Sequence, residues 1–438
     1  MADRARVSPG SIRTNPAGAA FAAALLFLVA LNLRPALTTV GPLLPQIGAG
    51  EGIDEGTQGL LGALPLLAFG FASLLVPRLS ARFGPERAVL FALLALGAGI
   101  LVRSFTGHAG LWIGTVVLGA AIAIGNVVVP ALVKREYPGS MVRATGIYSS
   151  CLALSAGIGA AIAVPIADAT DWQRSLAVWA IPAFLVAGLW WPRARGSGRI
   201  SEGSAKVAET TGSAAHRDPS DASERLDPSA PAHRLDPSVA RAASQTVWRQ
   251  PTAWVLTAYM GLQSTCFYVL ITWLPTIEVA AGVPDHRTGL HMLAFQVVGV
   301  IAGLSIPRLM RRPDSQIAAT IASSGATLVG TLGLLAMPSA SLLWIMVAGL
   351  GTGSSLVVAL SLISMRGRTH DEVTRLSGMA QSLGYLFAAA GPVAAGTLAE
   401  STGSWDATLV MVAALSATQL GVGVVAGRDR RPPVVRVA

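Results

Sequence analysis

The sequence predicts an all-α polytopic membrane protein whose 12 transmembrane helices form two parallel six-helix repeats. Three observations predict this fold class: few charged residues, recurring apolar segments of membrane-spanning length, and an internal repeat. Only 32 basic and 23 acidic residues occur among 438, or 13% of the chain, against about 25% in ordinary soluble domains. Mean hydropathy is +0.58. A soluble protein of this length needs more polar surface, so the composition excludes an ordinary soluble enzyme.

Apolar segments of about 20 residues, the length that crosses a bilayer, follow one another along the whole chain. A membrane-embedded backbone must satisfy its own hydrogen bonds, which predicts helices. No short alternating segments of the β-barrel kind compete with this interpretation. The segments are 18–46, 57–78, 86–105, 109–133, 143–167, 172–192, 251–277, 288–308, 315–337, 340–364, 375–399 and 405–426.

The first segment follows a basic N-terminus and so resembles a signal peptide. However, it continues through Asn32, Arg34 and several prolines without a small-residue cleavage site. We therefore interpret it as a retained first membrane helix.

One long hydrophilic stretch divides the helices six and six. It is rich in Ser, Ala and Pro and repeats the tripeptide DPS three times. Such a composition buries no core and predicts disorder; a docking role for a partner is the alternative. The predicted division is a cytoplasmic tail 1–17, an N-terminal bundle 18–192, a cytoplasmic linker 193–250, a C-terminal bundle 251–426 and a cytoplasmic tail 427–438.

The basic residues predict the orientation. With the N-terminus inside, 28 of the 32 Lys and Arg fall in cytoplasmic loops and tails. Arg103, Arg174 and Arg287 fall outside, and Arg34 lies within a helix. Because cytoplasmic loops carry the excess of Lys and Arg, both termini are expected in the cytoplasm. The net charge of +9 then meets anionic membrane lipid, and no nucleic-acid partner is expected.

The two halves repeat each other. A shift of 230 residues places VPRLSAR at 76–82 over IPRLMRR at 306–312, and Pro45 over Pro275. A shift of 232 places Gly146 over Gly378. An even number of helices in each half makes the repeats parallel. Two such repeats joined by a long loop are the architecture of major facilitator transporters, whose halves rock about a central site.

Arg34 is the one ionised side chain that the sequence places near mid-membrane, where charges are costly and usually functional. A buried ion pair needs a carboxylate at the same depth, and every acid falls in a loop, a tail or a helix end. A second alternative is capping by backbone carbonyls freed by Pro35 and Pro42. We favour a third, in which Arg34 faces a cavity and binds an anionic solute. Thr38, four residues later, shares its helix face.

Other polar side chains at comparable depth are candidates for the same site. Any single Ser or Thr is more simply explained as contact between helices, whereas amides and tyrosines need larger polar partners. With Arg34 and Thr38, the predicted substrate-binding residues are Asn126, Gln263, Ser264, Tyr268, Gln296, Gln381 and Tyr385.

Enzymatic chemistry and cofactors are not expected. No Gly-rich segment ends in Gly-Lys-Ser/Thr, which removes a nucleotide-driven pump. No nucleophile–base constellation appears in the membrane, and six scattered histidines offer no metal site. His291, one turn from the outer end of its helix, is interpreted as a solvated residue; titration with external pH is the alternative.

Four strings carry a family resemblance. LNLRPALTTVGPLLPQI at 31–47 and GLQSTCFYVLITWLPTI at 261–277 resemble helices 1 and 7 of the cyanate-transporter and 2-nitroimidazole-transporter family, within the major facilitator superfamily. IGNVVVPALVKREYP at 124–138 and GMAQSLGYLFAAAGPVAAG at 378–396 are similar to its helices 4 and 11. The resemblance implies a secondary transporter of the bacterial inner membrane.

The loop between helices 2 and 3 departs from the superfamily pattern. Pro77 stands where a Gly is usual and Ala81 where an Asp is usual, while a basic cluster remains. The carboxylate that normally latches this cytoplasmic gate is therefore missing. The expected gating residues are Arg78, Arg82, Arg87, Arg308 and Arg312.

The sequence thus predicts alternating-access transport of a small anionic or nitrogen-rich solute, cyanate-like or related. Arg34 would anchor the charge, and amides would bind the remainder. A coupling ion or proton stays open, and a monomer is expected. The alternative is an exporter of a neutral or weakly basic drug-like compound such as a nitroimidazole, which usually requires an acid in the cavity. A membrane sensor would need a folded cytoplasmic module that 193–250 does not supply.

Overall fold

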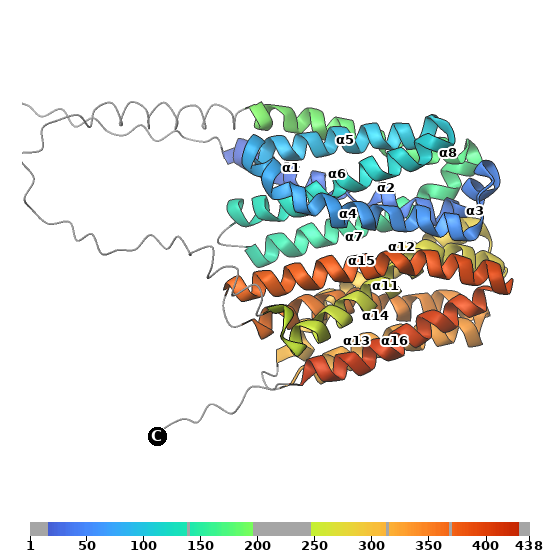
Figure 1. The fold of residues 1–438 in the computed structure, drawn as a ribbon. Coiled ribbons are helices and arrows are strands. Elements are labelled where there is room, and N and C mark those ends of the chain that lie inside the picture. Colours follow the sequence, from blue (N-terminus) through green and yellow to red (C-terminus); the bar gives the residue numbers. More distant parts are fainter. Residues whose placement is uncertain (1–15, 138–140, 196–246, 312–314, 368–369, 429–438) are drawn as a thin grey trace, which may run out of the picture.

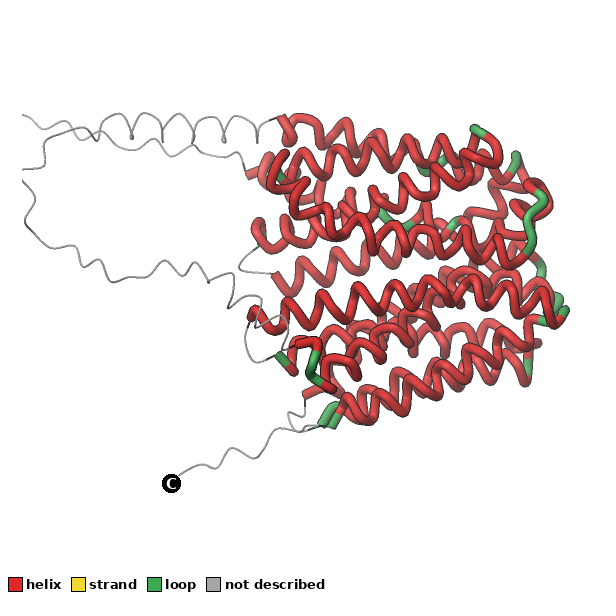
Figure 2. Tube along the Cα trace, viewed as in Figure 1, coloured by secondary structure: helices red, strands yellow, loops and turns green. Residues whose placement is uncertain are grey.

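The computed structural model describes residues 16–137, 141–195, 247–311, 315–367 and 370–428. Within these ranges nearly every residue is helical, and the one β-bridge is isolated, between Ser315 and Arg428. Figure 2 shows loops confined mostly to the ends of the helices. The predicted all-α class is confirmed. The tail 1–17, most of the linker 193–250, the tail 427–438 and Arg312 lie almost wholly outside the described residues.

The first half contains the helices before residue 196. They are α1 (Pro16–Asn32), α2 (Pro35–Thr38), α3 (Val40–Glu51), α4 (Glu55–Phe83), α5 (Pro85–Phe105), α6 (Gly107–Glu136), α7 (Met141–Ala169) and α8 (Trp172–Ala177), with a further helix over 180–195. The second half contains α11 (Pro251–Ala280), α12 (Asp285–Ser305), η2 (Ile306–Arg311), α13 (Ile317–Ala336), η3 (Pro338–Ala340), α14 (Ser341–Arg366), α15 (His370–Thr402) and α16 (Trp405–Gly427).

These helices account for all the predicted spans. Ten helical segments of the described chain are long and apolar enough to cross a membrane. The pair Ala24–Thr38 and Val40–Glu51, bent by 40°, makes an eleventh. The remaining predicted segment, 57–78, coincides with α4, which is not among these candidate spans.

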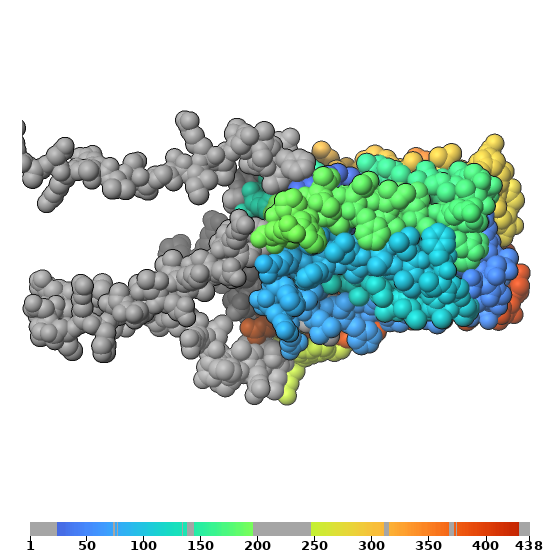
Figure 3. Space-filling model, turned by 90° about the horizontal axis from the view of Figure 1, so that it is seen from above, coloured from blue at the N-terminus to red at the C-terminus, as the bar shows by residue number. Residues whose placement is uncertain are grey.

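The helices run side by side, with the first half forming one layer and the second half the other (Figure 1). The described ranges that stop at 195 and 428 and that begin at 247 do so at one end of the bundle, here called the linker end (Figure 1). The opposite end, here called the far end, carries the turns after α3, α5 and α15 (Figure 1). Seen from above, the first half alone covers most of the visible face (Figure 3).

Close backbone contacts join the halves toward the far end. A Cβ added to Gly59 of α4 would lie 2.3 Å from the Pro392 carbonyl oxygen of α15. A Cβ added to Gly289 of α12 would lie 2.6 Å from the Ala160 carbonyl oxygen of α7. Only glycine allows such an approach. Below, these contacts are called the far-end seal.

The far-end seal follows the internal repeat. Gly59 and Gly289 are 230 positions apart, and Ala160 and Pro392 are 232 apart, the two shifts at which the halves align. Gly41 and Ile271 are also 230 positions apart, and these two equivalent residues contact each other. A Cβ added to Gly41 would lie 2.7 Å from the Ile271 carbonyl oxygen. The two parallel repeats therefore meet through equivalent residues.

Candidate functional site

Helix 1 is interrupted at Arg34. Asn32 ends α1, and Pro35 begins α2 at its first turn. Because proline has no N–H and restricts the residue before it, the chain turns at this point. Thr38 fixes the short helix by donating to the Ala156 carbonyl of α7, at 2.7 Å. An interrupted backbone is tolerated at membrane depth where it lines a cavity or is buried in protein.

A cavity of about 390 Å³, here called the central cavity, lies between the halves. Arg34 and α7 line it from the first half, and α11, α12, α14 and α15 line it from the second. Arg34 is the only charged side chain among its lining residues in the described chain. The central cavity can therefore offer a negatively charged solute one planar cation in an otherwise apolar and amide-bearing wall.

Three tyrosines lie near the Arg34 guanidinium, and two of them, Tyr268 and Tyr385, line the central cavity with it. It interacts with the Tyr268 hydroxyl and lies close enough to Tyr385 and Tyr148 for electrostatic interaction. The rings of Tyr268 and Tyr385 meet edge to face, with centroids 6.4 Å apart. Neither cavity that Arg34 lines has a carboxylate on its wall in the described chain, so the charge of Arg34 is not neutralised there.

Most predicted binding residues lie on the wall of the central cavity. Gln263, Ser264, Tyr268, Gln296 and Tyr385 line it together with Arg34. Gln263 donates to the Ser264 hydroxyl at 2.5 Å, which holds the amide beside its neighbour. Arg34 and Ser264 occupy equivalent positions, 230 apart, so the repeat places a polar group on the same spot in both halves.

Three predicted residues lie elsewhere. Asn126 is outside the central cavity, and its side-chain oxygen accepts from the Tyr148 hydroxyl at 3.4 Å. Gln381 is half-buried outside the lining and donates to Ser377 at 2.6 Å. Thr38 lines a smaller, adjoining cavity.

The central cavity extends toward the linker end. Its wall includes Thr145 and Gly146 at the start of α7, Leu304 at the end of α12 and Leu360 in the last two turns of α14. These residues lie near the linker end, whereas the far-end seal closes the other side. Within the described residues, the cavity therefore reaches toward one end of the bundle while close packing joins the halves at the other.

The smaller cavity, of about 40 Å³, has two arginines on its wall: Arg34 and Arg103. The sequence assigns Arg103 to the outer side of the membrane at a helix end, and it does not predict that the side chain is buried in the protein. Its side chain is 1% exposed and donates from Nη1 to the Ala36 carbonyl at 2.8 Å. The segment 86–105 already contained Arg103, but its position near the helix end concealed how far the long side chain reaches inward. This cavity is called the two-arginine cavity below.

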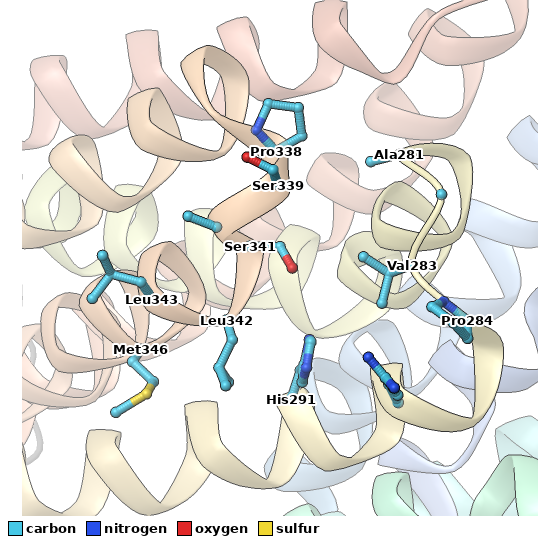
Figure 4. A pocket seen from close by; sticks show the side chains of 13 residues that line it. Ala281, Val283, Pro284, His291, Pro338, Ser339, Ser341, Leu342, Leu343 and Met346 are labelled. Carbon is cyan, nitrogen blue, oxygen red and sulfur yellow. The ribbon is translucent and has the colours of Figure 1, made fainter.

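A buried carboxylate was also missed. Glu278 is 1% exposed, although its place near the end of α11 suggests a loop residue. Its Oε1 accepts from His291 Nδ1 at 2.5 Å and from the Ser341 hydroxyl at 2.8 Å. His291, expected to be solvated, has a side chain only 15% exposed. Figure 4 shows His291 and Ser341 on the wall of a far-end pocket between α12 and α14.

The predicted gating arginines lie near the linker end. Arg78, Arg82 and Arg308 are exposed, and Arg82 lies over the Phe83 ring, 5.3 Å from its centroid. Arg87 donates to the Ala194 carbonyl at 3.4 Å. None of these contacts tests the gating role, which stays a prediction.

No group of three or more His, Cys, Asp and Glu that could hold a metal ion occurs among the described residues. Cys151 and Cys266 are free thiols. Asp54 caps the N-terminus of α4 at the far end, where its carboxylate accepts from the Thr57 N–H at 2.6 Å. This bond holds the pKa of the Asp54 carboxyl below its usual value.

Comparisons with known proteins agree on one family. The profile of the Major Facilitator Superfamily matches residues 19–392. The chain is 34% identical to the 2-nitroimidazole transporter of Escherichia coli (strain K12), covering 92% of this chain and 95% of that protein. It is 28% identical to the cyanate transport protein CynX of the same strain, covering 87% and 90%. The crystal structure of a D-xylose-proton symporter superimposes with a TM-score of 0.66 at 12% identity, covering 91% and 96%, which is a likeness of fold.

Proposed function

Since the chain belongs to the major facilitator superfamily and its relatives are named transporters, we propose that it carries a small anionic or nitrogen-rich solute through the central cavity by alternating access. The observation that supports this most directly is Arg34, the one charged side chain on the cavity wall within the described chain. The protein is a multi-pass membrane transporter, not an enzyme. Its proposed location is the bacterial inner membrane, with both termini in the cytoplasm.

Arg34 suits a solute with lone pairs arranged in a plane. A guanidinium presents a rigid fork of N–H donors, which binds planar acceptors by two parallel hydrogen bonds. Gln263 and Ser264 on the opposite half supply further polar groups. A cyanate-like anion would use the charge, and an azole ring would also stack on aromatic side chains such as Phe267 and Tyr268.

Access would alternate by rocking of the halves. The central cavity extends toward the linker end, and the far-end seal closes the other side. Binding would be followed by separation of the far-end contacts and approach of the helices at the linker end, where Arg78, Arg82, Arg87, Arg308 and Arg312 are the proposed gating residues.

The export of basic compounds, which carry a positive charge when protonated, is less favoured than the transport of an anion. A cationic or basic solute would be stabilised by a carboxylate in the cavity, and the described wall has none. The wall instead carries a positive charge, which repels such a solute.

The test is uptake into liposomes containing the purified protein, with radiolabelled cyanate and 2-nitroimidazole as probes. Replacing Arg34 with lysine keeps the charge but removes the donor fork. We expect solute affinity to fall by roughly 10-fold or more, as a bidentate charged interaction contributes about 1.5–3 kcal/mol. The control is Arg174→Lys, an exposed arginine paired with Asp171 at the far end. Unchanged uptake and affinity in Arg34→Lys would contradict the anchoring role.

A further inference from the structure

Two positive side chains converge on the two-arginine cavity without a neutralising partner. Arg34 lines it from the break in helix 1, and Arg103 lines it from α5. Within the described residues no acidic side chain is on its wall, and no ion pair involves either arginine. Buried charges in proteins are normally paired or bound to an ion.

Arg103 has hydrogen-bond donors that no acceptor uses within the described residues. One of its nitrogens, Nη1, donates to the Ala36 carbonyl. The other two, Nε and Nη2, are buried and have no hydrogen-bond partner among the described residues. Buried guanidinium donors left without acceptors are rare, because each costs free energy that a bound acceptor would recover.

Two of the neighbouring hydroxyls already donate to backbone carbonyls, while those of Thr272 and Tyr268 also lie on the wall. Thr38 donates its proton to the Ala156 carbonyl at 2.7 Å, and Thr115 donates to the Leu111 carbonyl at 2.6 Å. The donors that remain available on this wall are therefore mainly guanidinium N–H groups. The chemistry of the wall favours an occupant that accepts hydrogen bonds and carries negative charge.

The space limits the size of that occupant. About 40 Å³ holds one to three small atoms, since a single water needs roughly 10–15 Å³ measured in this way. A carboxylate on a larger solute would leave no room in this volume for the rest of the molecule. A free monovalent ion the size of chloride fits.

We propose that the two-arginine cavity binds a small inorganic monovalent anion, such as chloride, between Arg34 and Arg103. This site is separate from the central cavity and shares only Arg34 and Tyr268 with it. The bound anion neutralises the Arg103 donors and fixes the break in helix 1 through the Ala36 contact. The anion therefore acts as a resident ion that holds Arg34 in place, whatever the transported solute is.

The test is chloride binding to the full-length protein in detergent, prepared in gluconate buffer. Titration with chloride should raise the melting temperature to a plateau, and radioactive chloride should bind at about one ion per protein. Bromide should compete, whereas gluconate should not. The Arg103→Met variant should bind chloride roughly 10- to 100-fold more weakly, since hydrogen bonds to a charged group are lost.

A second measurement separates ion binding from a purely structural role of Arg103. In gluconate, Arg103→Met should melt at or above the wild-type temperature, because it removes a buried charge that has no partner. If Arg103 only ties α5 to Ala36, the variant should melt lower in every buffer and keep the chloride response. Arg174→Met serves as the control and should keep wild-type chloride binding.

Three results would overturn the proposal. They are the absence of saturable chloride binding to the wild type, equal stabilisation by chloride and gluconate, and unchanged chloride affinity in Arg103→Met. Should the variant not fold, the stoichiometry and anion selectivity of the wild type still decide the question. Solute uptake at constant chloride tests the transport function separately. The failure of one proposal therefore leaves the other intact.

Discussion

At the scale of single residues, the sequence located the central charge but not its surroundings. Arg34 stands inside a long apolar segment, so its depth was readable from hydropathy alone. Arg103 and Glu278 lie near helix ends, where sequence position does not reveal whether a side chain turns toward solvent or toward the protein. Long side chains reach several ångströms along a helix, and only tertiary packing decides the direction.

The sequence suggested that backbone carbonyls freed by prolines could cap the Arg34 guanidinium. In the structure, a carbonyl of this region accepts from Arg103 instead. The Ala36 carbonyl, one residue after Pro35, accepts from Arg103. Sequence reasoning identified the type of contact that an interrupted helix invites, but the donor comes from α5, 67 positions away. A contact over that separation leaves no periodic signal in the sequence.

Glu278 allows a prediction for stability. Replacing it with alanine leaves His291 Nδ1 and the Ser341 hydroxyl without their buried acceptor. Removing one member of a buried charged pair costs about 3–5 kcal/mol, so we expect a clear fall in the melting temperature in detergent. Glu278→Gln retains an oxygen acceptor and should lose much less. Equal melting temperatures for wild type and Glu278→Ala would contradict the structural role of this carboxylate.

At the scale of elements, all twelve predicted segments correspond to helices of the structure, with α1, α2 and α3 together forming the first. The sequence indicated this first element's prolines and its Arg34, but the 40° bend between its parts depends on packing against α7. Thr38 donates to Ala156, and Gly159 leaves room for Pro35, whose Cα would be 2.9 Å from an added Cβ. The side of α7 that accepts this turn could not be read from the first segment alone.

The contact of α4 with α15 gives a prediction at this scale. In Gly59→Ala the added methyl group would meet the Pro392 carbonyl, and over-packing of this kind costs about 1–3 kcal/mol. The state with a closed far end should therefore lose roughly 10-fold or more in population relative to the open one. The measurement is the alkylation rate of a cysteine at position 272 (Thr272→Cys) by a membrane-impermeant maleimide added from the far side. This rate should be higher with Gly59→Ala than in the background protein without it.

The matched control for this experiment is Gly70→Ala, on the same helix. A Cβ at that position meets nothing within 4 Å, so the alkylation rate should equal that of the background protein. Identical rates in Gly59→Ala and Gly70→Ala would show that this contact does not hold the far end closed.

At the scale of the whole molecule, the predicted all-α membrane fold and the family resemblance are confirmed by the structure and the relatives. Composition and the internal repeat were sufficient to predict the fold class, because both are properties of the whole chain. The conformation was not predictable, since the same two repeats can be open at either end. Only the packing of α4 with α15 and of α7 with α12 identifies the end that is closed here.

Rocking of the halves predicts that a covalent link at the far end blocks transport. A Cβ on Gly56 would lie 2.8 Å from Thr397 Cγ2, which places cysteines at these two positions within disulfide reach. In a background with Cys151→Ser and Cys266→Ala, oxidised Gly56→Cys/Thr397→Cys protein should not transport, and a reducing agent should restore uptake. The single variant Gly56→Cys should be insensitive to oxidation. Full transport by the cross-linked protein would exclude rocking at this end.

The far-end seal consists of glycine surfaces against peptide carbonyls. Each ion pair between described residues lies within one half of the molecule, so separating the halves at this end breaks none of them. Screening by dissolved salt weakens charge pairs but hardly affects close backbone packing. The packing of the far-end seal should therefore respond little to ionic strength, and the Gly56 N–H, which donates to the Glu400 carboxylate at 3.4 Å, is the contact between the halves at this end that screening would weaken.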